Sequence, residues 1–121
     1  MLQKDYILEI VGDFVDGVAK HLDAALAGDA EATGAVEQDV AGLLDLDPEV
    51  ALTLSPDSLV TMMVLSGMGD SVAAYVAFSL TRLADAYEAQ GDVDTAALRR
   101  AQAAAVGESF GCDPTVAPEG F

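Results

Sequence analysis

A helical pattern over residues 80–103 is the feature that most constrains the fold of this chain. The segment reads LTRLADAYEAQGDVDTAALRRAQA, with Ala, Leu and Tyr at three- and four-residue spacing on both sides of one interruption. Within that interruption, Gly91 can adopt the left-handed conformation that ends a helix. Asp92 can then accept hydrogen bonds from the free N–H groups that begin the next helix. The pattern therefore predicts an αα-hairpin.

Apolar residues recur at helical spacing along most of the remaining chain as well. The predicted helices cover residues 2–27, 30–46, 56–66, 70–90 and 93–108. Residues 47–54 read as a connector or a single helical turn. We therefore expect an all-α fold, in which about five helices form a compact bundle that ends in the hairpin. A single domain is expected over residues 1–108, with an irregular tail over residues 109–121, where Gly and Pro interrupt any periodicity.

The apolar stretch of residues 58–81 is long enough to cross a bilayer, and Asp70 is its only charged residue. A charge at mid-span is costly, however, and the Gly-rich residues 66–70 are typical of a helix break. We therefore expect two buried helices and no membrane span. Because residues 59–65 are apolar on nearly all sides of a helix, the first of the two is expected to be buried all round.

The charge balance limits the possible partners. The 121 residues include 21 Asp and Glu against 5 Lys and Arg, so the formal net charge is −16. Such a surface repels phosphate backbones and anionic lipids, which disfavours nucleic-acid and membrane binding. The one cysteine, Cys112, cannot form an internal disulfide, and acidic residues interrupt the N-terminal apolar runs that a signal peptide would need. A cytoplasmic location is expected.

The hairpin resembles one tetratricopeptide-repeat unit. Leu83, Tyr87, Ala96 and Ala103 match that pattern, as does the Gly-Asp turn, whereas Arg100 stands where the repeat has an aromatic residue. No second repeat is visible, so the other helices are expected to pack against the hairpin. The opening MLQKDYIL, the segment LLDLDPEVALTLSPDSL and the hairpin together resemble a family of uncharacterised bacterial helical proteins of unknown function. That resemblance implies an all-helical cytoplasmic domain and supplies no functional residues.

No catalytic, metal or nucleotide motif stands out in the sequence. His21 is the only histidine, and Val18 occupies the position where a Glu-x-x-His metal motif needs Glu. Cys112 lies near Asp113 and Glu108, whose charges raise a thiol pKa and indicate an inert cysteine. We therefore expect no cofactor and no metal, and we favour a protein that is not an enzyme.

A few residues are candidates for contacts with a partner or ligand. Met62 and Met63 belong to an adaptable apolar cluster that suits either the core or a groove for a partner helix. Arg82, Arg99 and Arg100 could bind an acidic peptide or carboxylate ligand, or could instead pair with local acids such as Asp85 and Glu88. Tyr75 and Tyr87 would join the arginines in a ligand pocket among the helices predicted over residues 56–66, 70–90 and 93–108.

Three functions are compatible with these features. The first is a non-enzymatic helical interaction module that binds an unknown protein partner. This module could also form a homodimer, if Tyr6, Ile10 or Phe14 on the long first helix is exposed. The second is a small-molecule-binding protein or enzyme that uses the pocket just described. The third is an acidic mimic of nucleic acid that occupies a basic groove on another protein.

Overall fold

The computed structural model describes residues 2–44, 46–66 and 69–118, and for residues 2–10, 48, 66 and 69–71 it describes the backbone only. In this part of the chain every regular element is a helix, which confirms the predicted all-α class. The helices are α1 (Leu2–Leu26), α2 (Ala30–Leu43), α3 (Pro48–Ala51), α4 (Pro56–Ser66), α5 (Gly69–Ala89) and α6 (Val93–Phe110). The single turn α3 occupies the region for which a connector or one helical turn was expected.

Two helix ends differ from the predicted ones by more than one residue. α2 stops at Leu43, where the N–H of the cap residue Leu44 bonds back to the Val40 carbonyl. α6 continues to Phe110. Its C-cap residue is Gly111, which adopts the left-handed conformation with a φ of 72°. The sequence pattern did not locate this last turn, because residues 107–110 carry no apolar stripe.

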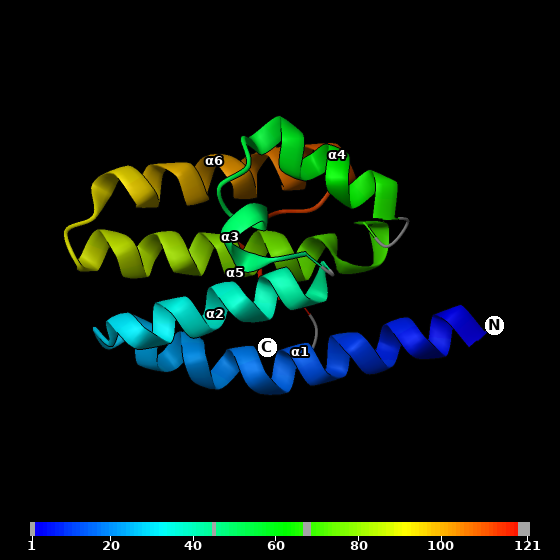
Figure 1. The fold of residues 1–121 in the computed structure, drawn as a ribbon, viewed down its shortest axis with the longest axis horizontal. Coiled ribbons are helices and arrows are strands. Elements are labelled where there is room, and N and C mark those ends of the chain that lie inside the picture. The colour runs from blue at the N-terminus through cyan, green and yellow to red at the C-terminus, as the bar shows by residue number, and fades with distance from the viewer. Residues whose placement is uncertain (1, 45, 67–68, 119–121) are drawn as a thin grey trace.

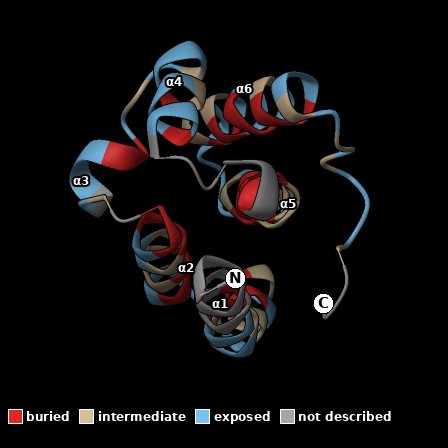
Figure 2. Ribbon diagram, turned by 90° about the vertical axis from the view of Figure 1, so that its right-hand side faces the viewer, coloured by how far each residue is buried: buried red, intermediate tan, exposed pale blue. Residues whose placement is uncertain are grey.

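The helices form three layers, with α5 in the middle (Figures 1 and 2). α1 and α2 pack against one side of α5, and α6 and α4 pack against the other. The central position of α5 follows from its apolar residues at three- and four-residue steps, Val72, Val76, Leu80 and Leu83, all of which are buried. After α6, residues 111–118 run past α5 toward α1 (Figure 2).

The turn predicted between residues 90 and 92 joins α5 to α6. Gly91 has a φ of 86°, which glycine adopts without strain. The Asp92 carboxylate accepts a hydrogen bond from the backbone N–H of Thr95 at 3.2 Å and so caps α6. α5 and α6 consequently run antiparallel, side by side along their length (Figure 1).

The apolar stretch of residues 58–81 is divided between two helices. α4 ends at Ser66 and α5 begins at Gly69, while the predicted break at residues 67–68 lies outside the described residues. None of the described helices combines the length and the apolar character needed to cross a membrane.

The prediction that this first helix is buried on all sides was wrong. Leu59 and Met63 of α4 are buried, but Val64 and Leu65 are 59% and 75% exposed. α4 lies in an outer layer and packs on α6 and α5 from one side only, so its other side faces solvent (Figure 2).

Candidate functional site

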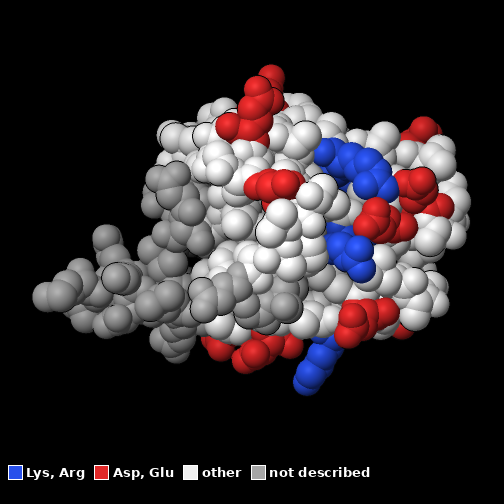
Figure 3. Space-filling model, turned by 180° about the vertical axis from the view of Figure 1, so that it is seen from behind, with Lys and Arg blue, Asp and Glu red and all other residues white. Residues whose placement is uncertain are grey.

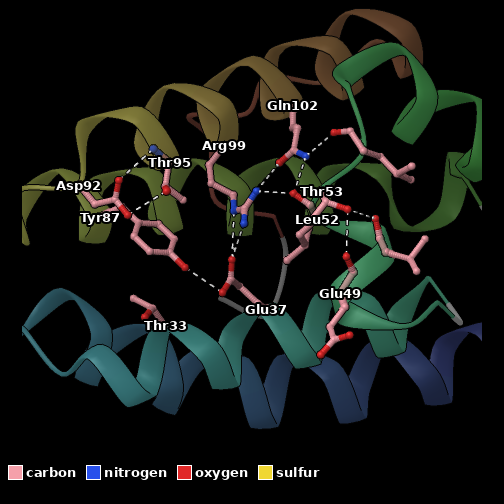
Figure 4. A network of polar contacts seen from close by, with 12 residues as sticks. Thr33, Glu37, Glu49, Leu52, Thr53, Tyr87, Asp92, Thr95, Arg99 and Gln102 are labelled. Atoms are coloured by element: carbon pink, nitrogen blue, oxygen red, sulfur yellow. Dashed lines mark hydrogen bonds and ion pairs between the residues drawn. The ribbon is translucent and has the colours of Figure 1, made fainter.

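A buried arginine lies at the centre of the largest polar network in the described structure. The side chain of Arg99 on α6 is directed inward and the residue is only 6% exposed. Its Nη2 and Nε atoms donate to Oε2 of Glu37 on α2, at 2.5 and 3.2 Å. Its Nη1 atom donates to the Leu52 carbonyl oxygen at 2.7 Å and to Oε1 of Gln102 at 3.1 Å (Figure 4). Arg99 therefore links α6 to α2 and to the segment between α3 and α4.

Gln102 and Tyr87 extend this network. Gln102 is completely buried, and its Nε2 atom donates to the carbonyl oxygens of Leu52 and Leu54 at 3.2 and 2.9 Å. The Tyr87 hydroxyl donates to Oε1 of Glu37 at 2.8 Å, and the Arg99 guanidinium lies 5.8 Å from the centre of the Tyr87 ring. Burial raises the pKa of Tyr87 to about 12, and the hydrogen bond to the Glu37 carboxylate acts in the same direction.

This network has the character of a structural clamp. Both carboxylate oxygens of Glu37 accept hydrogen bonds, and Arg99 donates to a carboxylate, a backbone carbonyl and an amide. Apart from the bond between Arg99 and Gln102 within α6, these bonds join segments that are distant in sequence, so the group ties α2, α5, α6 and the α3–α4 connection together. Its charged and polar groups thus have partners within the protein, as burial requires.

The other two candidate arginines lie on the surface beside acidic residues. Arg82 Nη1 is 3.3 Å from Asp85 Oδ2, one turn along α5. Arg100 Nη2 lies 3.0 Å from Asp85 Oδ1 and 2.5 Å from Glu88 Oε2, which joins α6 to α5. Blue and red side chains lie next to each other on this face in Figure 3. The structure therefore shows the local pairing that was one of the two alternatives for these arginines.

The remaining candidate contacts do not converge on one pocket. Tyr75 is half-buried and packs against the core, and Met63 is 1% exposed within it. Met62, the preceding residue in the chain, is 37% exposed on the outer side of α4. Tyr87 and Arg99 do meet, but they do so in the clamp, while Arg82 and Arg100 lie at the surface.

The surface also contains two shallow hollows. One, of about 300 Å³, lies between α1 and α2 and is lined by Asp13, Phe14, Gln38, Asp39, Gly42 and Leu43. The other, of about 280 Å³, lies between α1, α5 and the C-terminal segment and is lined by Ala19, Leu22, Asp23, Leu26, Phe78, Arg82 and Ala117. Arg82 is the one candidate contact residue found in either of these two hollows.

His21 has a partner that the sequence pattern did not reveal. Its Nδ1 atom lies 2.6 Å from Oδ2 of Asp39, so the pair connects α1 to α2 at a partly exposed position. No group of three or more potential metal ligands occurs among the described residues. Partial burial and the adjacent Asp113 raise the pKa of Cys112, which disfavours the reactive thiolate.

Of the three residues expected to support a homodimer, Phe14 has a side chain that the structure describes. Phe14 is buried in the core, so it is not available on the outside of α1. The side chains of Tyr6 and Ile10 lie outside the described residues. The structure therefore offers no exposed α1 stripe on which to build a dimer contact within its described part.

An apolar face remains on the outer side of α4. Met62, Val64 and Leu65 are exposed and lie within one turn of each other, and we call these three residues the α4 face. Residues 58–69 include no charged side chain, so this part of an otherwise acidic protein is uncharged. Sequence reasoning identified Met62 as a candidate contact, but missed Val64 and Leu65, which it assigned to the core.

Comparisons of the chain with models of protein families, with curated protein sequences and with solved structures gave no match.

Proposed function

We propose that this protein is a non-enzymatic interaction module that binds a protein partner on the α4 face. The observation that carries the proposal is the exposure of Met62, Val64 and Leu65, at 37%, 59% and 75%, within one turn of α4. Single exposed apolar residues are common on soluble proteins, but a contiguous group within an uncharged segment is typical of a binding surface.

Burial of the α4 face would stabilise a complex with a partner. Covering a large apolar side chain contributes about 1.5–3 kcal/mol when its burial is complete. Met and Leu are flexible enough to adapt to the shape of a partner, which favours an interaction surface over a rigid ligand pocket. The three side chains together would form the apolar centre of a small interface, to which polar contacts at the rim would add.

The clamp supports a non-enzymatic function. Arg99, Glu37 and Tyr87 are the residues that most resemble a polar active site, yet their hydrogen bonds hold helices together. General acid–base catalysis needs groups that face a cleft where a substrate can approach. We propose a cytoplasmic partner, because Cys112 is a free thiol, as is usual in reducing compartments.

The proposal is tested by partner capture with variants of the α4 face. The immobilised protein is exposed to a lysate of the source cells, and bound proteins are identified by mass spectrometry. A partner of this face should be captured by the unaltered chain and lost with the double variant Val64→Ser, Leu65→Ser. It should be retained by the control variant Val116→Ser, which removes a similarly exposed apolar side chain on the C-terminal segment.

Two results would contradict the proposal. One is a set of captured proteins that does not change when the α4 face is altered. The other is a photo-crosslinking residue at position 65 that forms no more adducts in cells than the same residue at position 116 on the C-terminal segment. Circular dichroism of each variant checks that the helical fold is retained, which is expected for substitutions at exposed positions.

A further inference from the structure

We infer that the occupant of the α4 face is a cationic amphipathic helix, which lies across the outer sides of α4 and α6. This inference rests on the proposed function and specifies the chemistry of the partner. It follows from the shape of the two adjacent helices and from the charge around them.

The outer side of α6 extends the α4 face with small residues. Ala97, Ala101 and Ala104 are exposed and follow each other at four- and three-residue steps, so they lie along one side of α6. α4 packs against α6, and both helices form the same outer layer of the molecule (Figures 1 and 2). Alanines allow the backbone of a third helix to approach closely, while the larger residues of α4 supply apolar contact.

A helix suits this surface better than an extended strand. The described part of the protein offers no sheet edge to which a strand could add its hydrogen bonds. An amphipathic helix needs only apolar contacts at three- and four-residue spacing, which Met62 and Leu65 on α4 and the alanines on α6 provide.

The acidic residues around this surface favour a positively charged partner. Asp57 at the start of α4 and Asp94 and Glu108 on α6 are exposed, and none has an ion-pair partner among the described residues. The nearby cation Arg100 is already paired with Asp85 and Glu88 on α5. Lys or Arg residues that flank the apolar side of a partner helix would find free carboxylates here.

The same charge argues against a second copy as the occupant. Each chain has a formal net charge of −16, so two copies that meet on this surface would repel each other. A basic helix would be attracted instead, and its binding should weaken as salt screens the attraction. Self-association would show the opposite dependence and strengthen with salt.

The test uses designed peptides as probes. A fluorescein-labelled amphipathic helix of Leu and Lys, about 18 residues or five turns long, is titrated with the protein, and binding is followed by anisotropy. A peptide with the same composition in scrambled order controls for charge alone, and a Leu–Glu helix controls for apolar contact alone. We expect the Leu–Lys helix to bind at least about tenfold more tightly than either control, since only it combines both interactions.

Variants of the protein locate the binding. The double variant Met62→Ser, Leu65→Ser should weaken binding of the Leu–Lys helix by about tenfold or more, whereas Val116→Ser, on the C-terminal segment, should leave it unchanged. Raising NaCl from about 50 to 300 mM should weaken binding to the unaltered protein. Asp57→Asn with Glu108→Gln should reduce this salt dependence.

Several outcomes would overturn the inference. One is that the Leu–Glu helix binds as tightly as the Leu–Lys helix. Another is that the Met62 and Leu65 substitutions leave the affinity for the Leu–Lys helix unchanged, and a third is that this affinity does not fall with salt. A dimer in light scattering that Leu65→Ser dissociates would also overturn it, since the occupant would then be a second copy. Capture of a partner through the α4 face without binding of the Leu–Lys helix would refute this inference and leave the proposed function standing. Loss of both would refute both.

Discussion

Arg99 and Arg100 are neighbours in the chain, yet they have opposite environments. Consecutive residues on a helix are rotated by about 100°, so one of the two faces α2 and the other the surface beside α5. Arg99 is buried against Glu37, whereas the side chain of Arg100 is 44% exposed. A guanidinium that is removed from water is stable only with a partner carboxylate, and Glu37 supplies it.

We predict that Arg99→Met lowers the free energy of unfolding by about 3–5 kcal/mol. The substitution retains most of the apolar volume but leaves the Glu37 carboxylate partly buried without its counter-ion, and it removes a donor from the Leu52 carbonyl. Urea denaturation followed by circular dichroism measures the change.

Arg100→Ala is the matched control for this variant. Its ion pairs with Asp85 and Glu88 are exposed, and such pairs contribute about 0–1 kcal/mol. If Arg100→Ala destabilised the protein as much as Arg99→Met, the assignment of the clamp to Arg99 would be wrong.

Tyr87 gives the clamp a dependence on alkaline pH. Its pKa is raised from about 10 to about 12, so the folded protein favours the protonated phenol. This contribution to stability is fully present below about pH 10 and is lost as the pH rises through about 12. Tyr87→Phe should reduce stability at neutral pH by about 1 kcal/mol, through loss of the hydrogen bond to Glu37.

The stability difference between the unaltered protein and Tyr87→Phe should narrow as the pH rises from about 10 to 12. Denaturant unfolding of both proteins across this range measures it. A difference that stays constant with pH would show that the Tyr87 hydroxyl does not titrate as described.

At the scale of the elements, the C-terminal segment is held against α6 at a glycine. A Cβ atom added to Gly107 would lie 2.7 Å from the Cys112 carbonyl oxygen and 2.8 Å from Cγ of Pro114. The Cys112 N–H also donates to the Gly107 carbonyl oxygen at 2.9 Å. Only glycine permits this close return of the chain, so the start of the predicted irregular tail is ordered by contact with α6.

We predict that Gly107→Ala destabilises the protein by about 1–3 kcal/mol, because the new methyl group overlaps the chain that crosses it. The matched control is Gly34→Ala in α2, where a Cβ atom has no neighbour within 4 Å. Alanine at that helical position should stabilise the protein by up to about 1 kcal/mol.

Thermal unfolding monitored by circular dichroism compares the two glycine variants. Limited proteolysis should also cut residues 111–118 faster in Gly107→Ala than in the unaltered chain. An increase in melting temperature for both variants would show that the contact with Pro114 does not constrain α6.

For the molecule as a whole, repulsion among the acidic surface residues destabilises the folded state. With a formal net charge of −16, the folded protein brings its carboxylates closer together than the unfolded chain does. Salt shortens the range of this repulsion from about 30 Å at 0.01 M to about 3 Å at 1 M.

We therefore predict that the melting temperature rises by several degrees between about 0.01 and 0.5 M NaCl, since screening relieves the repulsion in the folded state. The surface pairs of Arg82 and Arg100 weaken under the same conditions, but their contribution is small. Differential scanning calorimetry in NaCl and in choline chloride separates general screening from specific binding of Na⁺. A melting temperature that falls with both salts would contradict the prediction.

The helical class, the approximate helix positions and the turn at Gly91 and Asp92 could be predicted from the amino-acid sequence. These features depend on residues that are three or four positions apart or adjacent, so the information lies within short segments. Pairing of Arg100 with Asp85 or Glu88, which lie 15 and 12 positions away on the other helix of the hairpin, was one of the alternatives expected for this residue.

The faces of each helix that are covered depend on how the helices pack against one another. Arg99 meets Glu37 across 62 residues of sequence, so no local pattern distinguished it from Arg100. Likewise, both the buried and the exposed sides of α4 carry large apolar residues. The spacing of these residues therefore did not show that Met63 is buried and Leu65 is exposed. The position of α4 in an outer layer leaves one side without a neighbour, because burial is a property of the packed molecule and not of the segment.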